Sequence, residues 1–194
     1  MADTAPDDDV QSFGCSDPTP LPSTIPKEMK RLIVTSPGNG TLEDCKIEIE
    51  TVPTPTPTYG QVLIKVVAAP VNPSDYRSWY KSRPTAYPMP IGSEGSGIVI
   101  ATGGILPDIR CPVGTNVGFL AMSCDELKQG SYSEYVVANA LTEVFPMPAD
   151  VPIEDCASFF VNPYTAVGIS IPPRLRGRIR LLYTLPRQVN WGKC

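Results

Sequence analysis

The stretch VVAAPVNPSDYRSW, residues 66–79, decides how this sequence folds. Its first half is rich in valine and alanine, which favours a buried β-strand, and Pro73 ends such a strand because it has no amide proton for the sheet. Asn72, Ser74 and Asp75 therefore follow the end of a strand directly. Such a polar cluster is typical either of a loop that carries functional side chains into a cleft or of an ordinary Asx/Pro turn.

Short segments with strand character surround this stretch. KIEIETV, residues 46–52, alternates isoleucine with glutamate, which predicts a half-buried strand with Ile47 and Ile49 on one face. The 23 prolines argue against long helices. We therefore expect a mainly β fold with short helices, arranged as a barrel-like domain. The other expected elements are strands at 31–35, 61–71, 96–104, 113–121, 130–140 and 141–148, and helical turns at 73–80.

Composition divides the chain into four segments. Residues 1–28 are acidic and proline-rich and are expected to be a disordered tail, whereas residues 29–150 form the β domain. Residues 151–170 are expected to form a helical exit with Asp150 as its N-cap. Residues 171–194 carry six basic and no acidic residues. Three explanations of this basic segment stay open: an aberrant end of the chain, a basic interaction tail, and a genuine short end of the domain.

The residue counts exclude several classes of protein. The chain has no histidine, which excludes Ser/His/Asp and Cys/His catalysis and any zinc site with an imidazole ligand. The six cysteines form no C-x-x-C pair and are expected to be free thiols. No apolar run reaches the roughly 18 residues of a membrane span, and the start of the chain does not resemble a secretory signal. We therefore expect no membrane partner and a cytoplasmic protein, with mitochondria as the alternative location.

Five motifs occur in a fixed order: VNPSD, GSEGSGIV, VGTNV, GSYSEYVV and FFVNPYTAVG. Together they resemble the N-terminal, GroES-like catalytic domain of the medium-chain dehydrogenase/reductase superfamily over residues 30–169. Within it the chain is most similar to the zinc-independent quinone oxidoreductase and 2-enoyl thioester reductase branch. The resemblance implies a partly open β-barrel that is truncated before the Rossmann domain of the family, and it implies NADPH or NADH as the cofactor of the intact family member.

The glycine-rich motif GSEGSG, residues 92–97, does not predict a phosphate-binding loop. Its spacing is G-x-x-G-x-G and it precedes a strand, whereas a phosphate loop opens a helix. We expect its glycines to permit a tight turn, and Glu94 to be structural.

The resemblance also bears on metal binding. Zinc alcohol dehydrogenases have a cysteine where this chain has Asn72, a histidine where it has Ser93, and a cysteine near Val161. An amide and a hydroxyl are poor zinc ligands and valine is none, so we expect no metal. Without a Lewis acid, the acceptor oxygen must be polarised by hydrogen-bond donors.

Site residues follow from the same resemblance. It places Asn72 and Thr165 near the cofactor, and it makes Ser74 and Asp75 residues that orient the substrate or the loop. An ordinary turn at Asn72 and Asp75, and a packing role for Thr165, stay open as alternatives.

The enoyl reductases use a tyrosine as proton donor about eleven residues after the motif's asparagine, where this chain has Arg83. Because the loop departs from the family pattern there, Tyr80 is our first candidate for the catalytic tyrosine. Tyr87 is the second, because it precedes Pro88 as the family tyrosine often precedes a proline.

The function implied is that of a catalytic-domain fragment of a zinc-free NAD(P)H-dependent oxidoreductase. It would reduce an enoyl thioester, a quinone or a related activated alkene, and the chain alone is expected to be inactive. The alternative is a non-catalytic GroES-like binding module. A nucleic-acid partner is not expected, because the net charge is −4. Exposed Phe159, Phe160 and Val161 on the exit helix are expected to cause association into homo-oligomers or aggregates.

Overall fold

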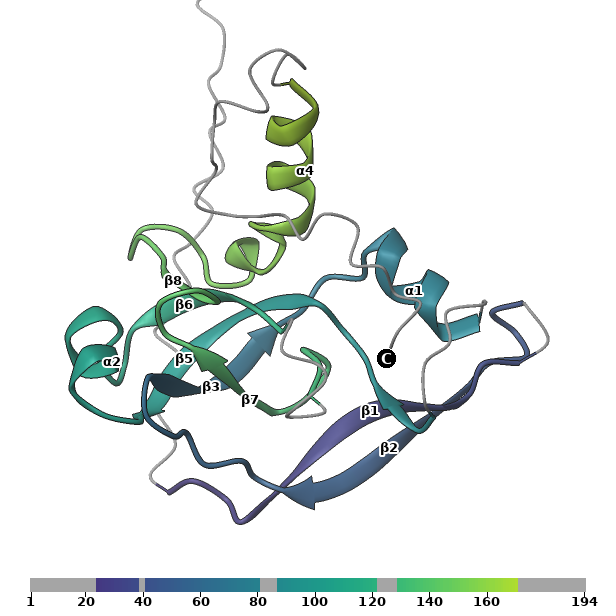
Figure 1. Cartoon of the computed structure of the whole chain (residues 1–194), viewed down its shortest axis with the longest axis horizontal. Coiled ribbons are helices and arrows are strands. Elements are labelled where there is room, and N and C mark those ends of the chain that lie inside the picture. Colours follow the sequence, from purple (N-terminus) through teal and green to yellow (C-terminus); the bar gives the residue numbers. More distant parts are fainter. Residues whose placement is uncertain (1–23, 39–40, 81–86, 122–128, 171–194) are drawn as a thin grey trace, which may run out of the picture.

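The computed structural model describes residues 24–38, 41–80, 87–121 and 129–170, without the side chains of Arg77, Ser78 and Tyr80. The chain is mainly β with short helices, and its strands form two antiparallel sheets, as Figure 1 shows. The elements are β1 (Glu28–Ser36), β2 (Lys46–Pro53), β3 (Gln61–Ala68), α1 (Pro73–Tyr80), β4 (Met89–Pro90), β5 (Glu94–Thr102), α2 (Ile105–Arg110), β6 (Asn116–Leu120), β7 (Tyr135–Asn139), β8 (Val144–Pro146), the 3-10 helix η1 (Asp155–Ser158) and α4 (Val161–Ser170).

The larger sheet has the order β7-β3-β5-β6-β8 and curls into the partly open barrel that the sequence predicts. Its middle strand, β5, is buried along residues 94–100, which explains why that strand shows no alternation of polar and apolar residues. Inside the sheet, a core of fully buried apolar side chains holds the strands together through burial of apolar surface. Its largest members are Phe119 and Ile64.

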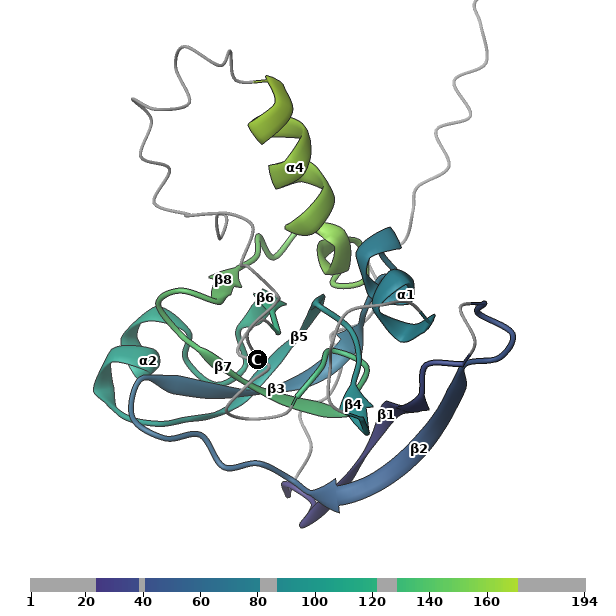
Figure 2. The same cartoon turned by 45° about the vertical axis from the view of Figure 1, so that its right-hand side comes forward.

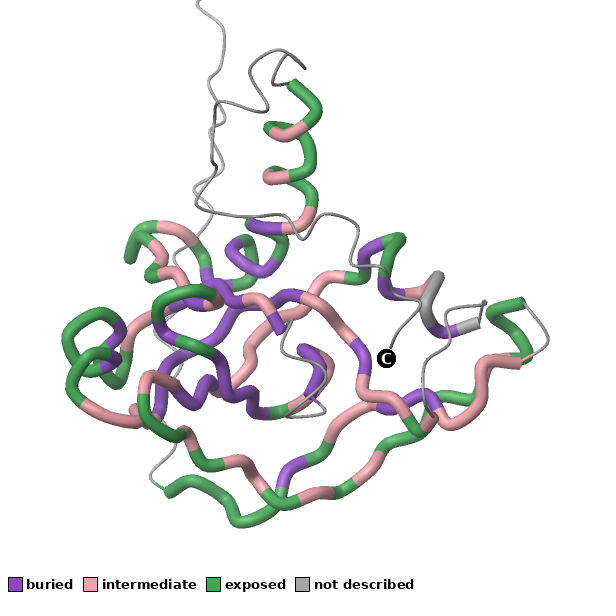
Figure 3. The backbone as a smooth tube through the Cα atoms, in the orientation of Figure 1, coloured by how far each residue is buried: buried purple, intermediate pink, exposed green. Residues whose placement is uncertain are grey.

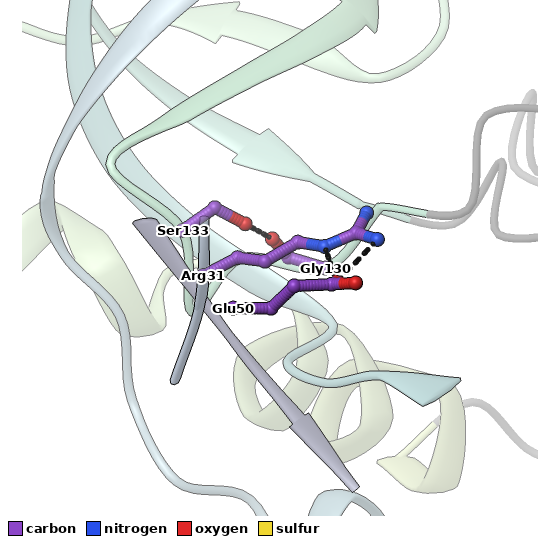
Figure 4. Close-up of polar contacts among 4 residues, drawn as sticks. All are labelled: Arg31, Glu50, Gly130 and Ser133. Atoms are coloured by element: carbon purple, nitrogen blue, oxygen red, sulfur yellow. Dashed lines mark hydrogen bonds and ion pairs between the residues drawn. The ribbon is translucent and has the colours of Figure 1, made fainter. Parts of the chain in front are cut away.

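The smaller sheet has the order β2-β1-β4, so β2 is an edge strand. A strand at residues 46–52 is confirmed, but the expected burial of its isoleucine face is wrong, because Ile47 and Ile49 are 40% and 69% exposed. The opposite face carries Glu50, whose carboxylate lies 2.8 Å from the guanidinium of Arg31 on β1 (Figure 4). A second hydrogen bond in that view, from the Ser133 hydroxyl to the Gly130 carbonyl, stabilises the turn before β7.

The chain changes direction where the sequence predicts it. Strand β3 ends at Ala68, three residues earlier than the expected strand, and α1 then begins at Pro73, which confirms the helical turns expected at 73–80. Proline suits the first turn of a helix because its missing amide proton would have no partner there. Helix α2 has no counterpart among the expected elements.

The helical exit differs from the expectation. Asp150 caps no helix, since the chain turns at residues 149–150 and the next element, η1, begins at Asp155 with Glu154 before it. Phe160 is buried, with 2% of its surface exposed, so its expected exposure is wrong, whereas Phe159 is 47% exposed. Phe160 packs against Phe145 of β8 at a ring-centroid distance of 4.6 Å.

Helix α4 projects away from both sheets, as the two views in Figures 1 and 2 agree. None of its residues is buried, and Figure 3 shows it in the colours of exposed and intermediate residues only. The predicted acidic tail, apart from its last residues, and the basic segment 171–194 lie outside the described residues. Within the described ranges no helix has the length and apolar character of a membrane span.

Candidate functional site

The start of α1, the start of β5 and the first turn of α4 meet in one buried polar network. Asn72 is 1% exposed, and its backbone amide donates to Asp75 Oδ2 at 2.9 Å. The Asp75 amide in turn donates to the Asn72 carbonyl at 2.9 Å. These reciprocal bonds start helix α1 and fix the direction in which the Asn72 side chain leaves the loop.

Glu94 is the centre of this network. Its side chain is fully buried, and its two oxygens accept three hydrogen bonds. Oε1 accepts from Asn72 Nδ2 at 2.8 Å, and Oε2 accepts from the backbone amides of Phe160 at 3.0 Å and Val161 at 2.9 Å. The first amides of a helix have no partner within the helix, and a carboxylate suits this positive end of the helix dipole. Glu94 of β5 therefore caps α4, in place of a residue close to α4 in sequence.

A tight turn delivers Ser93 and Glu94 to this place. Gly92 has φ of +97°, a conformation that other residues rarely adopt, and a Cβ there would lie 2.3 Å from Ser131 Oγ. Strand β5 then begins at Glu94, so the glycine-rich motif opens a strand and not a helix, as predicted.

Ser93 and Tyr132 extend the network towards the surface. The Ser93 hydroxyl donates to Asp75 Oδ1 at 2.8 Å. The Tyr132 hydroxyl donates to the Pro70 carbonyl at 2.9 Å. Burial, and then the negative charges of Asp75 and Glu94, raise the pKa of Tyr132 well above its usual value, so its phenol stays protonated even at alkaline pH where an exposed tyrosine ionises. Sequence reasoning did not assign Tyr132 to the site, although it belongs to the quoted motif GSYSEYVV.

Two residues of α4 lie on the outer side of the network. Asn162 Nδ2 donates to Asn72 Oδ1 at 3.1 Å, and the rest of Asn162 is exposed. Thr165, one turn later, is exposed and donates its hydroxyl proton to the Val161 carbonyl at 2.5 Å. Asn162 was not among the predicted site residues. Its only sequence signal is its place between Val161 and Pro163 in the last of the five motifs.

The remaining predicted site residues are spread around this network. Ser74 is exposed in the first turn of α1. Tyr80 is the last residue of α1, and its side chain lies outside the described residues. Tyr87 is half-buried and packs against the cluster formed by Val34, Trp79 and Ile91. Burial and the neighbouring Cys45 thiol raise the pKa of Tyr87 above its usual value.

Hydrogen bonds through Glu94 and Asp75 link Asn72, Ser93 and Val161, the residues that stand at or near the zinc-ligand positions according to the resemblance. Asn72 and the Val161 amide both bond to Glu94, and Ser93 bonds to the Asp75 carboxylate that also bonds to Asn72. No group of three or more His, Cys, Asp or Glu residues that could hold a metal ion occurs in the described ranges. The side-chain amide of Asn72 and the hydroxyl of Ser93 are poor zinc ligands, and the side chain of Val161 offers no ligand atom, so these residues do not fit a zinc ion.

Comparisons with known proteins agree with this architecture. Residues 58–149 match the family described as the alcohol dehydrogenase GroES-like domain. A zinc-type alcohol dehydrogenase-like protein of Schizosaccharomyces pombe is 33% identical over 127 residues, which cover 64% of this chain and 37% of that protein. A trans-enoyl reductase of Alternaria alternata is 26% identical over 154 residues, which cover 75% of this chain and 42% of that protein.

A solved structure described as an NADPH:quinone reductase, from Mesorhizobium loti, superposes with a TM-score of 0.61 and 34% identity. The match covers 75% of this chain and 44% of that one, so the chain spans about two fifths of the length of the proteins that it matches. The described elements and these matches together show that the chain carries the N-terminal, GroES-like domain of the medium-chain dehydrogenase/reductase superfamily.

Proposed function

We propose that this chain forms the substrate-side domain of an NAD(P)H-dependent oxidoreductase that reduces an enoyl thioester, a quinone or a related activated alkene. The observation that carries the proposal is the buried network around Asn72, Asp75 and Glu94 where the starts of α1, β5 and α4 meet. A network of this kind holds side chains in fixed orientations, which a site for hydride transfer requires. The trans-enoyl reductase and quinone reductase relatives support the class of reaction.

In this proposal the cofactor supplies a hydride, and the residues of the chain orient it and handle the proton. Asn72 and Thr165 lie at the cofactor side, and Ser74 and Asp75 orient the loop that faces the substrate. For an enoyl thioester, the hydride adds to the β-carbon and a proton adds to the α-carbon, so that the C=C bond becomes a single bond. A tyrosine, Tyr80 or Tyr87, polarises the acceptor oxygen or gives the proton.

The 194 residues contain no G-x-G-x-x-G turn, the motif that binds the pyrophosphate of a dinucleotide in Rossmann domains. We therefore propose that the 194-residue chain alone is inactive, and that activity belongs to a longer protein that includes this domain. Zinc takes no part in the proposed reaction.

The test compares two proteins: the 194-residue chain and the longest product that its gene encodes. Oxidation of NADPH and of NADH is followed by absorbance in the presence of a quinone and of a short 2-enoyl thioester. The proposal expects reductase activity in the longer protein only, unaffected by a zinc chelator. Absence of activity with every acceptor and both cofactors would contradict it. Parallel variants Tyr87→Phe and Tyr80→Phe identify the tyrosine, because the catalytic one lowers kcat when its hydroxyl is removed.

A second function is favoured by the exposure of α4. Val167 is 52% and Ile169 is 70% exposed on this helix, and Phe159 before it is 47% exposed. Exposed apolar side chains of this kind form contacts with other proteins or with further copies of the chain. We propose as the alternative a non-catalytic binding module that docks through α4, and we expect homo-oligomers of the isolated chain. Sedimentation of the wild type and of Ile169→Asp tests this: an unchanged monomer in both would contradict association through α4.

A further inference from the structure

Three side chains form a one-way relay of hydrogen bonds from the first turn of α4 into β5. Asn162 Nδ2 donates to Asn72 Oδ1 at 3.1 Å, and Asn72 Nδ2 donates to Glu94 Oε1 at 2.8 Å. The side-chain amides of Asn162 and Asn72 thus both direct their nitrogen, as a hydrogen-bond donor, towards the buried Glu94. The relay ends at a carboxylate that is fully buried.

The carboxylate sets the direction of the relay. An ionised carboxylate only accepts hydrogen bonds, so Asn72 must turn its NH₂ group towards Glu94. The other oxygen of Glu94 already accepts from the backbone amides of Phe160 and Val161. Because Asn72 is 1% exposed, its oxygen cannot turn to bulk water and accepts from Asn162 instead. Asn162 therefore directs its NH₂ group inwards and leaves its oxygen, Oδ1, on the outer side.

The outer side of Asn162 is exposed, and no residue of the described chain donates to its Oδ1. Thr165, one helical turn later, is also exposed, but its hydroxyl proton is donated to the Val161 carbonyl. The Ser93 hydroxyl likewise donates its proton inwards, to Asp75. At all three positions the donor groups are already used within the protein, so the remaining capacity of these oxygen atoms is to accept hydrogen bonds, and a complementary ligand must bring donors.

We propose that Asn162 is a ligand-binding residue whose Oδ1 accepts a hydrogen bond from an N–H or O–H group of the bound dinucleotide, and that Glu94 holds it in this orientation through Asn72. The donor is the nicotinamide carboxamide or a ribose hydroxyl. Asn162 is thus the binding residue, and Glu94 is a positioning residue that does not touch the ligand. This inference rests on the proposed function for the identity of the ligand, but the relay itself does not depend on it.

The relay is tested first on the 194-residue chain without ligand, by urea unfolding of single and double variants. Glu94→Gln supplies an NH₂ group, so Asn72 and Asn162 can both turn round and the relay runs in reverse. Asn162→Asp places a carboxylate oxygen, which only accepts, opposite the oxygen of Asn72. Asn72 cannot rotate its NH₂ group towards the introduced carboxylate while Glu94 is a carboxylate, because Glu94 needs the same NH₂ group. We expect Asn162→Asp to lower the urea midpoint in the wild-type background and to lower it much less in the Glu94→Gln background.

Two control variants separate the relay from simpler effects. Thr165→Asp places the same charge one helical turn further along α4, without contact with Asn72, so its dependence on Glu94→Gln measures charge repulsion alone. Asn162→Ala removes the amide without imposing a direction, and its effect should be alike in both backgrounds. The comparison is between the losses in urea midpoint that Asn162→Asp and Thr165→Asp cause in the two backgrounds. If Glu94→Gln reduces the loss from Asn162→Asp no more than it reduces the loss from Thr165→Asp, the relay is overturned.

The dissociation constant of NADPH is then measured from the fluorescence of NADPH. This experiment uses the longest product that the gene encodes. Glu94→Gln should weaken binding roughly three- to tenfold, the value of one hydrogen bond, because Asn162 then presents NH₂ to the ligand. Adding Asn162→Asp to Glu94→Gln should restore the affinity, since the introduced carboxylate can only accept. A purely structural role of Glu94 predicts no such restoration, and its absence would overturn the assignment.

An analogue identifies the donor on the ligand. The 3-acetylpyridine analogue of NADPH has a methyl ketone in place of the carboxamide and lacks its N–H groups. If the carboxamide is the donor, Glu94→Gln weakens NADPH but not the analogue; if a ribose hydroxyl is the donor, both are weakened alike. A wild-type protein that binds no dinucleotide would overturn this ligand and the proposed function together, whereas the unfolding experiment would still decide the relay separately.

Discussion

Phe160→Ala is the substitution for which the structure predicts the largest loss of stability near the site. The ring is 2% exposed, lies 4.6 Å from the ring of Phe145, and stacks on Tyr164 at 5.7 Å with an interplanar angle of 6°. Removing a buried phenylalanine ring costs about 3–5 kcal/mol in unfolding free energy, because apolar burial is lost and a cavity remains. With a urea dependence of about 1–3 kcal/mol per molar, the urea midpoint should fall by roughly 2 M.

Phe159 provides the matched control for this experiment, because it is the same residue type, is adjacent in sequence and is 47% exposed. Phe159→Ala should cost about 1 kcal/mol or less, as is usual for a half-exposed position. Unfolding is followed by tryptophan fluorescence and by circular dichroism. Equal losses for the two variants, or a loss below about 1.5 kcal/mol for Phe160→Ala, would refute the packing of this segment against β8.

Three further predictions concern other parts of the fold. Gly97→Ala should destabilise the chain by about 1–3 kcal/mol in urea unfolding, because a Cβ there would lie 2.2 Å from the backbone oxygen of Lys65; a neutral outcome would contradict the pairing of β3 with β5. Burial raises the pKa of Tyr132, so above about pH 10 the unfolded state ionises first and the unfolding free energy falls as the pH rises; Tyr132→Phe should reduce this dependence, and an identical pH profile would argue against burial of the phenol. Glu50→Gln should cost at most about 1 kcal/mol, and less at high salt, because the ion pair with Arg31 is partly exposed; a larger loss measured at high salt would contradict this.

Sequence patterns that extend over only a few residues predicted most of the strands and helix α1 correctly. Pro73 and the polar residues around it mark the start of α1, and seven strand segments read from apolar runs correspond to strands of the two sheets. The burial of β2 was predicted wrongly, because alternation shows that a strand has two faces but not which face another layer covers. At the edge of the smaller sheet, the glutamate face meets Arg31 and the isoleucine face stays exposed.

In the candidate site, too, local motifs were recognised in the sequence, whereas contacts between residues distant in sequence were not. The motif around Asn72 and the motif around Val161 both marked places that belong to the network, but the cap of α4 was sought at Asp150, close to the expected start of the helix. The residue that caps α4 is Glu94, 66 positions before Phe160 in sequence. Tyr132 lies in the turn before β7, and no local sequence pattern connects this turn to Asp75.

By itself, the sequence determined the fold class, the position of the turns and the absence of histidine chemistry, since these depend on residue type and on neighbours within a few positions. The tertiary structure alone decided which polar side chains are buried together and in which direction their hydrogen bonds run. The physical reason is that a buried donor or acceptor must find a partner wherever the fold brings one within reach, however distant it is along the chain. Glu94 illustrates this, because its three donors come from Asn72, Phe160 and Val161, and their approach to one carboxylate fixes the geometry of the candidate site.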